Sequence, residues 1–197
     1  MKNIIAIILL LIITSCAGKK TIEGDNYYDQ GEYSKALESY NKFLRVYPRD
    51  IKTLYNRARA QEKLGNIELA IQDLNTLLEL EPEHLQARIT LGEIEFTLGD
   101  YNQAFYEFDQ AVNSHKQSSI AYVYRAKANQ KLSKFQKALS DYDVAIRLDS
   151  KNGMAFLYRG TLYVYQKKNS SACNDFKKAK ELGVIEAEYA LKKYCKK

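Results

Sequence analysis

Long apolar runs, prolines, histidines and cysteines are all scarce in this sequence of 197 residues, and each scarcity excludes a class of protein. The longest apolar run, Ile4 to Ile13, is shorter than the roughly 20 residues that a helix needs to cross a bilayer. The few prolines and glycines form no linker, so one continuous structured domain is expected. His84 and His115 lie in no nucleophile or metal-ligand pattern, and HExxH, GxSxG and phosphate-loop motifs are missing, so we expect no enzyme, no metal and no cofactor.

The beginning of the chain has the outline of an export signal: a basic start, a short apolar run and small residues after it. Ile13-Thr14-Ser15-Cys16 resembles the bacterial lipobox. The resemblance implies that residues 1–15 are removed and that Cys16 carries a covalent lipid, such as palmitate, as a membrane anchor. Ala17 after the cysteine favours the outer membrane, facing the periplasm. The alternative is an ordinary secretory signal with a chance cysteine.

The formal charge is +6, with a sequence pI of about 9.0. Such a balance raises the question of nucleic acid. Because export separates the chain from nucleic acid, we expect none as a partner. The basic residues are scattered except in the tail after Leu191.

A repeat of 34 residues runs through the chain without insertion or deletion. We divide it into repeats 1 to 5, residues 17–50, 51–84, 85–118, 119–152 and 153–186, and number the places within each repeat from its first residue. Three columns recur on this spacing: alanine at place 20 (Ala36, Ala70, Ala104, Ala138, Ala172), a large apolar residue at place 24 (Tyr40, Leu74, Phe108, Tyr142, Phe176) and a small residue at place 8 (Gly24, Ala58, Gly92, Ala126, Gly160). Pro48 and Pro82 are also 34 residues apart, where helices should stop.

Within each repeat, apolar residues at helical spacing lie on both sides of a short turn, which Gly31, Gly65 and Gly99 occupy in the first three repeats. This pattern resembles the tetratricopeptide repeat. It implies an all-α, right-handed superhelical solenoid of five helical hairpins. Residues 186–194 read as one more helix, and we expect residues 187–197 to form a C-terminal capping helix with a basic tail.

Two further features are expected to be structural. Arginine at place 7 occurs only in the repeats with aspartate at place 23, which indicates ion pairs within a repeat or across neighbours: Arg57 with Asp73, Arg125 with Asp141, and Arg159 with Asp175. Cys173 and Cys195 lack the neighbours of a zinc site. In an exported protein they are candidates for a disulfide, which would close a loop of about 22 residues and stabilise the fold by roughly 3 kcal/mol. Two free thiols are the alternative.

The resemblance also implies a partner-binding groove lined by the first helix of each repeat. Its N-terminal half is mostly polar and its C-terminal half apolar. The candidate groove residues are Tyr55, Arg59, Ile89, Phe96, Ile120, Val123, Tyr124, Lys127, Met154, Leu157, Tyr158, Val164 and Tyr165. Several of them could instead pack between neighbouring helices. The clamp that binds chaperone tails in some relatives is not expected, because only Asn56 matches it.

The sequence therefore predicts a membrane-anchored, non-enzymatic interaction scaffold of the bacterial cell envelope that recruits a partner peptide or helix. One alternative is a receptor for an anionic non-protein ligand such as cell-wall glycan. Another is a structural lipoprotein that forms homo-oligomers.

Overall fold

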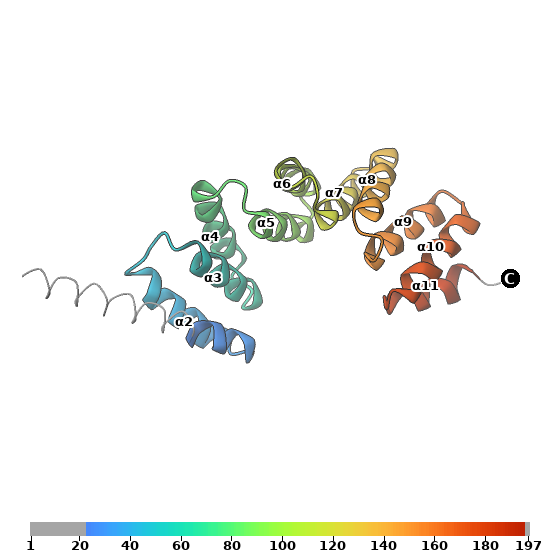
Figure 1. Cartoon of the computed structure of the whole chain (residues 1–197). Coiled ribbons are helices and arrows are strands. Elements are labelled where there is room, and N and C mark those ends of the chain that lie inside the picture. Colours follow the sequence, from blue (N-terminus) through green and yellow to red (C-terminus); the bar gives the residue numbers. More distant parts are fainter. Residues whose placement is uncertain (1–22, 196–197) are drawn as a thin grey trace, which may run out of the picture. The chain divides into compact units, whose positions relative to one another are not determined.

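The computed structural model describes residues 23–195, and this part of the chain consists of helices and turns without a strand (Figure 1). It divides into two compact units, one ending at Ala87 and the other beginning at Arg88. The predicted signal peptide and the lipid anchor at Cys16 lie outside the described residues. No helix among residues 23–195 is long and apolar enough to cross a bilayer.

The first unit begins with helical residues 23–29 and continues with three complete helices. These are α2 (Tyr33–Leu44), α3 (Ile51–Lys63) and α4 (Ile67–Leu80). Helix α3 packs against both α2 and α4. Helix α5 (Leu85–Leu98) begins in the first unit and continues in the second.

The second unit continues with six more helices in chain order. They are α6 (Tyr101–Ser114), α7 (Ser119–Lys131), α8 (Phe135–Leu148), α9 (Gly153–Tyr165), α10 (Asn169–Glu181) and α11 (Glu186–Tyr194). Each packs against the next, and α7 also packs against α9. Helices α3, α5, α7 and α9 begin at the first residue of repeats 2, 3, 4 and 5, and α11 begins where the extra helix is expected.

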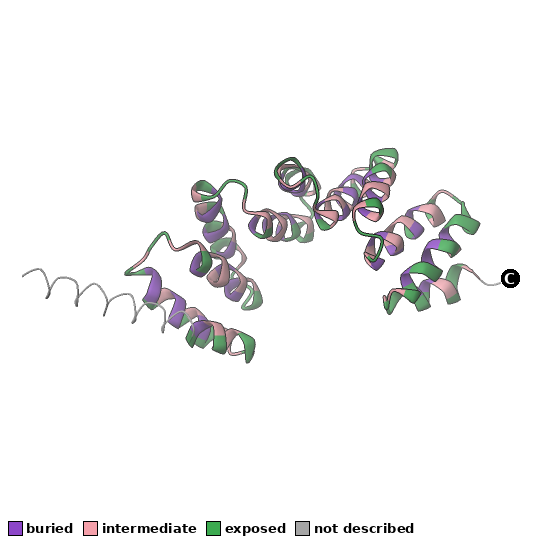
Figure 2. Ribbon diagram, in the orientation of Figure 1, coloured by how far each residue is buried: buried purple, intermediate pink, exposed green. Residues whose placement is uncertain are grey.

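The helix pairs approach closely because place 8 is small and place 24 is large. A Cβ atom added to Gly160 would lie 2.7 Å from the Phe176 ring and 3.2 Å from the Ala172 carbonyl oxygen. The place-24 rings and the place-20 alanines are fully or almost fully buried. Figure 2 shows the result, with buried residues along one side of the helices and exposed or intermediate residues along the other.

The turns inside the hairpins need a residue with positive φ. Gly31, Gly65 and Gly99 have φ of 76°, 78° and 90°, as the sequence suggests. Repeats 4 and 5 have no glycine there, and Ser133 and Lys167 both adopt φ of 59°. The left-handed conformation costs a side-chain-bearing residue roughly 1–2 kcal/mol, so the surrounding helices hold these two turns in place.

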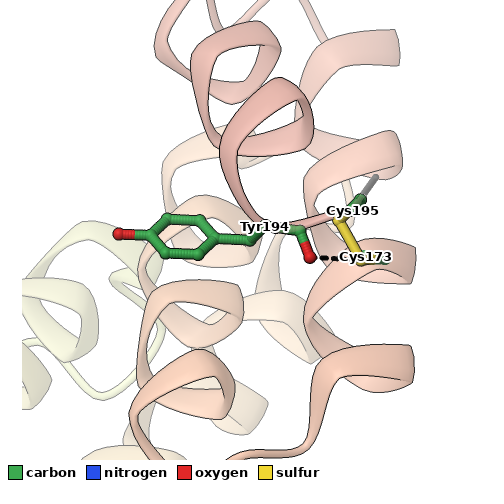
Figure 3. Close-up of a disulfide and its surroundings, with 3 residues drawn as sticks. All are labelled: Cys173, Tyr194 and Cys195. Carbon is green, nitrogen blue, oxygen red and sulfur yellow. Dashed lines mark hydrogen bonds between the residues drawn. A yellow bond between two sulfur atoms is a disulfide. The ribbon is translucent and has the colours of Figure 1, made fainter. Parts of the chain in front are cut away.

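Helix α11 covers the last hairpin and is tied to it covalently. Cys173 on α10 and Cys195 after α11 form a disulfide with their Cα atoms 5.7 Å apart (Figure 3). Ala187 and Ala190 of α11 belong to the buried cluster that also contains Leu157 and Phe176. The cap therefore buries the apolar side of the last hairpin that no further repeat covers.

Each place-7 arginine links three helices. The sequence suggests contacts either within a repeat or across neighbouring repeats, and both kinds occur together. Arg125 Nε and Nη2 donate to the two carboxylate oxygens of Asp141, at 3.0 and 2.6 Å, while Nη1 donates to Asp109 at 2.7 Å. Arg159 binds Asp175 and Asp143 in the same way. Arg57 binds Asp73 in this two-bond manner and takes Asn41 as its third partner. One arginine thus fastens its own hairpin to the second helix of the preceding repeat.

Candidate functional site

Two hollows lie side by side on the surface that α5, α7 and α9 form in the second unit, and they share Lys127 and Tyr158. The smaller, about 130 Å³, is lined by Ile120, Val123, Tyr124, Lys127, Asn152, Met154 and Tyr158. The larger, about 470 Å³, is lined by Phe96, Lys127, Gln130, Lys131, Ser133, Phe135, Tyr158 and Tyr165. We call them the Ile120 hollow and the Phe96 hollow, and together the Lys127 groove.

Aromatic rings surround the ammonium group of Lys127. Its Nζ lies 5.3 Å from the ring centre of Phe96, 5.0 Å from that of Tyr124 and 5.1 Å from that of Tyr158. One turn further along α7, Lys131 Nζ is 5.9 Å from the Phe96 ring. Each cation over a ring contributes from about 0.5 to 2 kcal/mol, more where water is excluded. The rings therefore fix the lysine where the two hollows meet.

Burial shifts the pKa values of the titratable groups in this groove. It lowers the pKa of Lys127, because the ammonium group loses water, and the nearby charge of Glu93 acts in the opposite direction. Burial also raises the pKa of Tyr124, helped by its hydrogen bond to Glu93 and by the charge of that carboxylate. The same effect raises the pKa of Tyr158. Both phenols therefore stay neutral near pH 7 and present hydroxyl groups beside the cation.

Large apolar side chains remain open to solvent in the groove. Ile120 is 48% exposed and Tyr165 is 67% exposed. The Tyr165 ring lies against that of Phe135, with 4.8 Å between their centres. A hollow with apolar walls and a few fixed polar groups has the composition of a binding site.

The corresponding surface of the first unit is polar. Asp25 there accepts hydrogen bonds from Lys52 at 2.6 Å, Asn56 at 2.8 Å and Tyr40 at 3.0 Å. Arg59 lies over the Tyr28 ring, 4.6 Å from its centre, and 5.8 Å from the centre of the Tyr55 ring. Tyr55 also contacts the His84 ring, at 5.6 Å between centres. Arg59 and Lys127 occupy place 9, and each covers the aromatic residue at place 12 of the preceding repeat.

Some candidate groove residues lie elsewhere. The placement of Leu157 in the groove is wrong: it is only 8% exposed and packs with Phe176 under α11. Val164 is partly buried, packs against the same cluster and lines neither hollow. Val123 is buried against α8 and reaches only the floor of the Ile120 hollow. Ile89 is partly buried and lines neither hollow.

Sequence reasoning missed one aromatic groove residue and several polar partners of the arginines. Phe135, on the second helix of repeat 4, contributes to the Phe96 hollow although only first helices were considered. Repeat 3 lacks the place-7 arginine, and Arg88 at place 4 pairs there with Glu107. The third arginine partners (Asn41, Asp109, Asp143) all occupy place 25, so the 34-residue period already contained the signal for them. Among residues 23–195, no group of three or more His, Cys, Asp or Glu could hold a metal ion.

Comparisons with known proteins agree with this fold. The tetratricopeptide repeat family model matches residues 26–90. Outer dynein arm-docking complex subunit 4 of Danio rerio is 43% identical over 49 residues, which cover 25% of this chain and 10% of that protein's length. The chain thus spans only a tenth of this relative.

Solved structures resemble most of the chain. MamA (41-end) from Desulfovibrio magneticus RS-1 superposes with a TM-score of 0.75 and 21% identity, covering 84% of this chain and 94% of that one. TTC0263, a thermophilic tetratricopeptide repeat protein of Thermus thermophilus, gives a TM-score of 0.70 and 22% identity, covering 89% and 96%. At these identities the likeness concerns the fold. The chain has the all-helical tetratricopeptide architecture that the sequence predicts.

Proposed function

We propose that this chain is a protein–protein interaction scaffold and that the Lys127 groove is its recruiting surface. The observation that carries the proposal is the exposure of Ile120 and Tyr165 beside two apolar hollows. Exposed apolar side chains gathered in one place are typical of interaction sites. A groove between helices suits an amphipathic helix or an extended peptide. The tetratricopeptide architecture supports a non-enzymatic role of this kind.

We further propose that the scaffold works at a bacterial membrane, held by lipid on Cys16. The support is the sequence Ile13-Thr14-Ser15-Cys16, which resembles a lipobox, and the short apolar run before it. Each buried methylene group of an acyl chain contributes about 0.8 kcal/mol, and stable anchoring needs more than one chain. The outer membrane, facing the periplasm, is the proposed location. Another envelope protein is the proposed partner.

Cross-linking in the native membranes tests this function. The lipidated protein is compared with the double variant Ile120→Glu, Tyr165→Glu, which places charge on exposed groove positions and leaves the core intact. The matched control is Tyr106→Glu, Tyr189→Glu, because these side chains are 50% and 66% exposed outside the groove. We expect one enriched envelope protein with the wild type and the control, and its loss with the groove variant. Identical partners for all three proteins would refute the proposal.

Two further measurements separate the alternatives. Mass spectrometry of the mature protein should find an acylated Cys16 as its first residue, and an unmodified Cys16 would contradict lipid anchoring at this residue. Binding to an anionic cell-wall polymer should fall steeply as salt rises, because salt screens exposed charges. An apolar groove contact should survive the same salt. Homo-oligomers would appear as a concentration-dependent mass that the groove variant abolishes.

A further inference from the structure

Lys127 differs in its partners from Arg125 and Arg159, the partly buried place-7 arginines of the second unit. Arg125 and Arg159 each bind two carboxylates within the repeats. In the part of the chain that the structure describes, Lys127 makes no ion pair, and Glu93 acts on it only through its charge. Desolvation of an ammonium group costs free energy unless an opposite charge compensates it. A ligand carboxylate at Lys127 would offset that cost.

The charges around Lys127 favour an anion as its partner. Lys131, one turn along α7, adds a second ammonium group, which is solvent exposed. Glu93, the acid whose charge acts on Lys127, accepts the hydrogen bond of Tyr124. The hydroxyl groups of Tyr124 and Tyr158 remain protonated near pH 7, as described above. Because the Tyr124 hydroxyl donates to Glu93, the centre of the Lys127 groove offers an incoming group the positive charge of Lys127 and the hydroxyl donor of Tyr158.

Apolar hollows lie on both sides of this cationic centre. Lys127 and Tyr158 line both of them. A segment that fills both hollows must therefore cross Lys127. Its apolar side chains would enter the hollows, and the group between them would meet the ammonium. An isolated carboxylate ligand would leave the hollows empty, and a purely apolar ligand would cover Lys127 without pairing it.

We infer, building on the function proposed above, that the Lys127 groove binds a protein segment with an acidic side chain between two apolar anchors. The acidic side chain pairs with Lys127, and the two anchors occupy the Ile120 and Phe96 hollows. Lys131 adds to the electrostatic attraction for the acidic side chain and stays exposed to solvent when the segment is bound. The specificity of the scaffold then lies in the order apolar, acidic, apolar along the partner.

Blocked synthetic peptides test this order on the full chain. Three fluorescent sets have two apolar anchors at varied spacing, and the residues between the anchors are all Glu, all Gln or all Lys. A fourth set keeps the Glu residues and replaces the anchors with Ser. Binding is measured by fluorescence anisotropy with the wild type, with Lys127→Gln and with Lys177→Gln. Lys177 is an exposed lysine of α10, so its variant controls for the loss of one positive charge.

We expect the best peptide of the Glu set to bind at least about tenfold more tightly than its Gln counterpart, as a charge-assisted hydrogen bond allows. The Lys set should bind more weakly still. Lys127→Gln should remove the difference between Glu and Gln, whereas Lys177→Gln should keep it. The set without anchors should not bind measurably.

Other outcomes overturn the inference and bear differently on the proposed function. Equal binding of the Glu, Gln and Lys sets, abolished by Ile120→Glu, Tyr165→Glu, would leave an apolar recruiting groove without acidic specificity. A preference for Glu that persists in Lys127→Gln would place the recognition elsewhere. Tight binding of the set without anchors would indicate a polyanion site. Absence of binding by every set would reject the ordered motif, while the cross-linking experiment would still decide on the groove.

Discussion

The two carboxylates that bind Arg125 should differ strongly in their contribution to stability. Asp141 receives two hydrogen bonds from the guanidinium and one from Asn129, at 3.2 Å, and its side chain is 9% exposed. Asp109 receives one hydrogen bond from the guanidinium at 2.7 Å and one from Asn113 at 3.1 Å, and its side chain is 33% exposed. Burial alone would lower the pKa of Arg125, but its hydrogen bonds and ion pairs with both carboxylates outweigh burial and raise that pKa. The same cation thus provides a buried and a partly solvated pair for comparison.

Asp141→Ala should cost about 3 kcal/mol of unfolding free energy, at the low end for breaking a buried pair, because Arg125 retains Asp109. Asp109→Ala should cost about 1 kcal/mol or less, as for solvated pairs. Arg125→Ala should cost at least as much as Asp141→Ala, since it leaves the buried carboxylate with Asn129 alone. The expected order therefore follows the burial of the carboxylate in each pair.

Urea unfolding followed by far-UV circular dichroism measures these differences, with the denaturant slopes compared to confirm that each variant unfolds in the same way. A double-mutant cycle between positions 125 and 141 isolates their coupling. Asp143→Ala, which removes the equivalent single-bond partner of Arg159, should match Asp109→Ala. If Asp109→Ala costs as much as Asp141→Ala, or if the cycle gives no coupling, burial does not determine the strength of these pairs.

Three other changes have defined expectations. Replacing Cys173 and Cys195 together by Ala should lower stability by about 3 kcal/mol, because the bond closes a loop with a sequence separation of 22; urea unfolding with no loss would show that the bond does not constrain the unfolded chain. Lys167→Gly should stabilise the fold by up to about 1 kcal/mol, because φ there is 59°; a lower melting temperature would contradict this. Binding of the Glu peptides should weaken as pH rises through the lowered pKa of Lys127, whereas Lys127→Arg should keep its affinity at that pH; identical pH profiles for the two proteins would show that Lys127 does not titrate in binding.

The fold was predictable because each repeat contains the same constraints. The small place 8, the alanine at place 20 and the large place 24 are all needed for one helix to pack on the next, so the same solution recurs every 34 residues. Four first helices accordingly begin where the period places them. The arginine and aspartate columns were visible for the same reason. A constraint that occurs once, such as the pair of Arg88 and Glu107, leaves no period to detect.

The groove was only partly predictable because its lining depends on what covers each repeat. Leu157 occupies a place that the family pattern assigns to the groove, but α11 and α10 enclose it. The sequence predicts α11 without specifying which side chains lie beneath it. Exposure of Tyr165 and burial of Leu157 are consequences of tertiary packing, and two residues on the same helix differ because one faces the cap.

The residue at place 9 should affect the choice of partner without affecting the fold, which gives a last prediction. Its residues in repeats 1 to 4 are Asp25, Arg59, Glu93 and Lys127. The fold accepts either sign of charge there, because the core uses places 8, 20 and 24 instead. Lys127→Glu should therefore reverse the peptide preference from the Glu set to the Lys set, while the chain stays folded and loses stability only through the lost cation–ring contacts, each about 0.5 to 2 kcal/mol. The anisotropy assay measures the first effect, and Lys177→Glu controls for a charge change outside the groove. If Lys127→Glu unfolds the chain or leaves the preference for Glu intact, place 9 serves the fold and not the choice of partner.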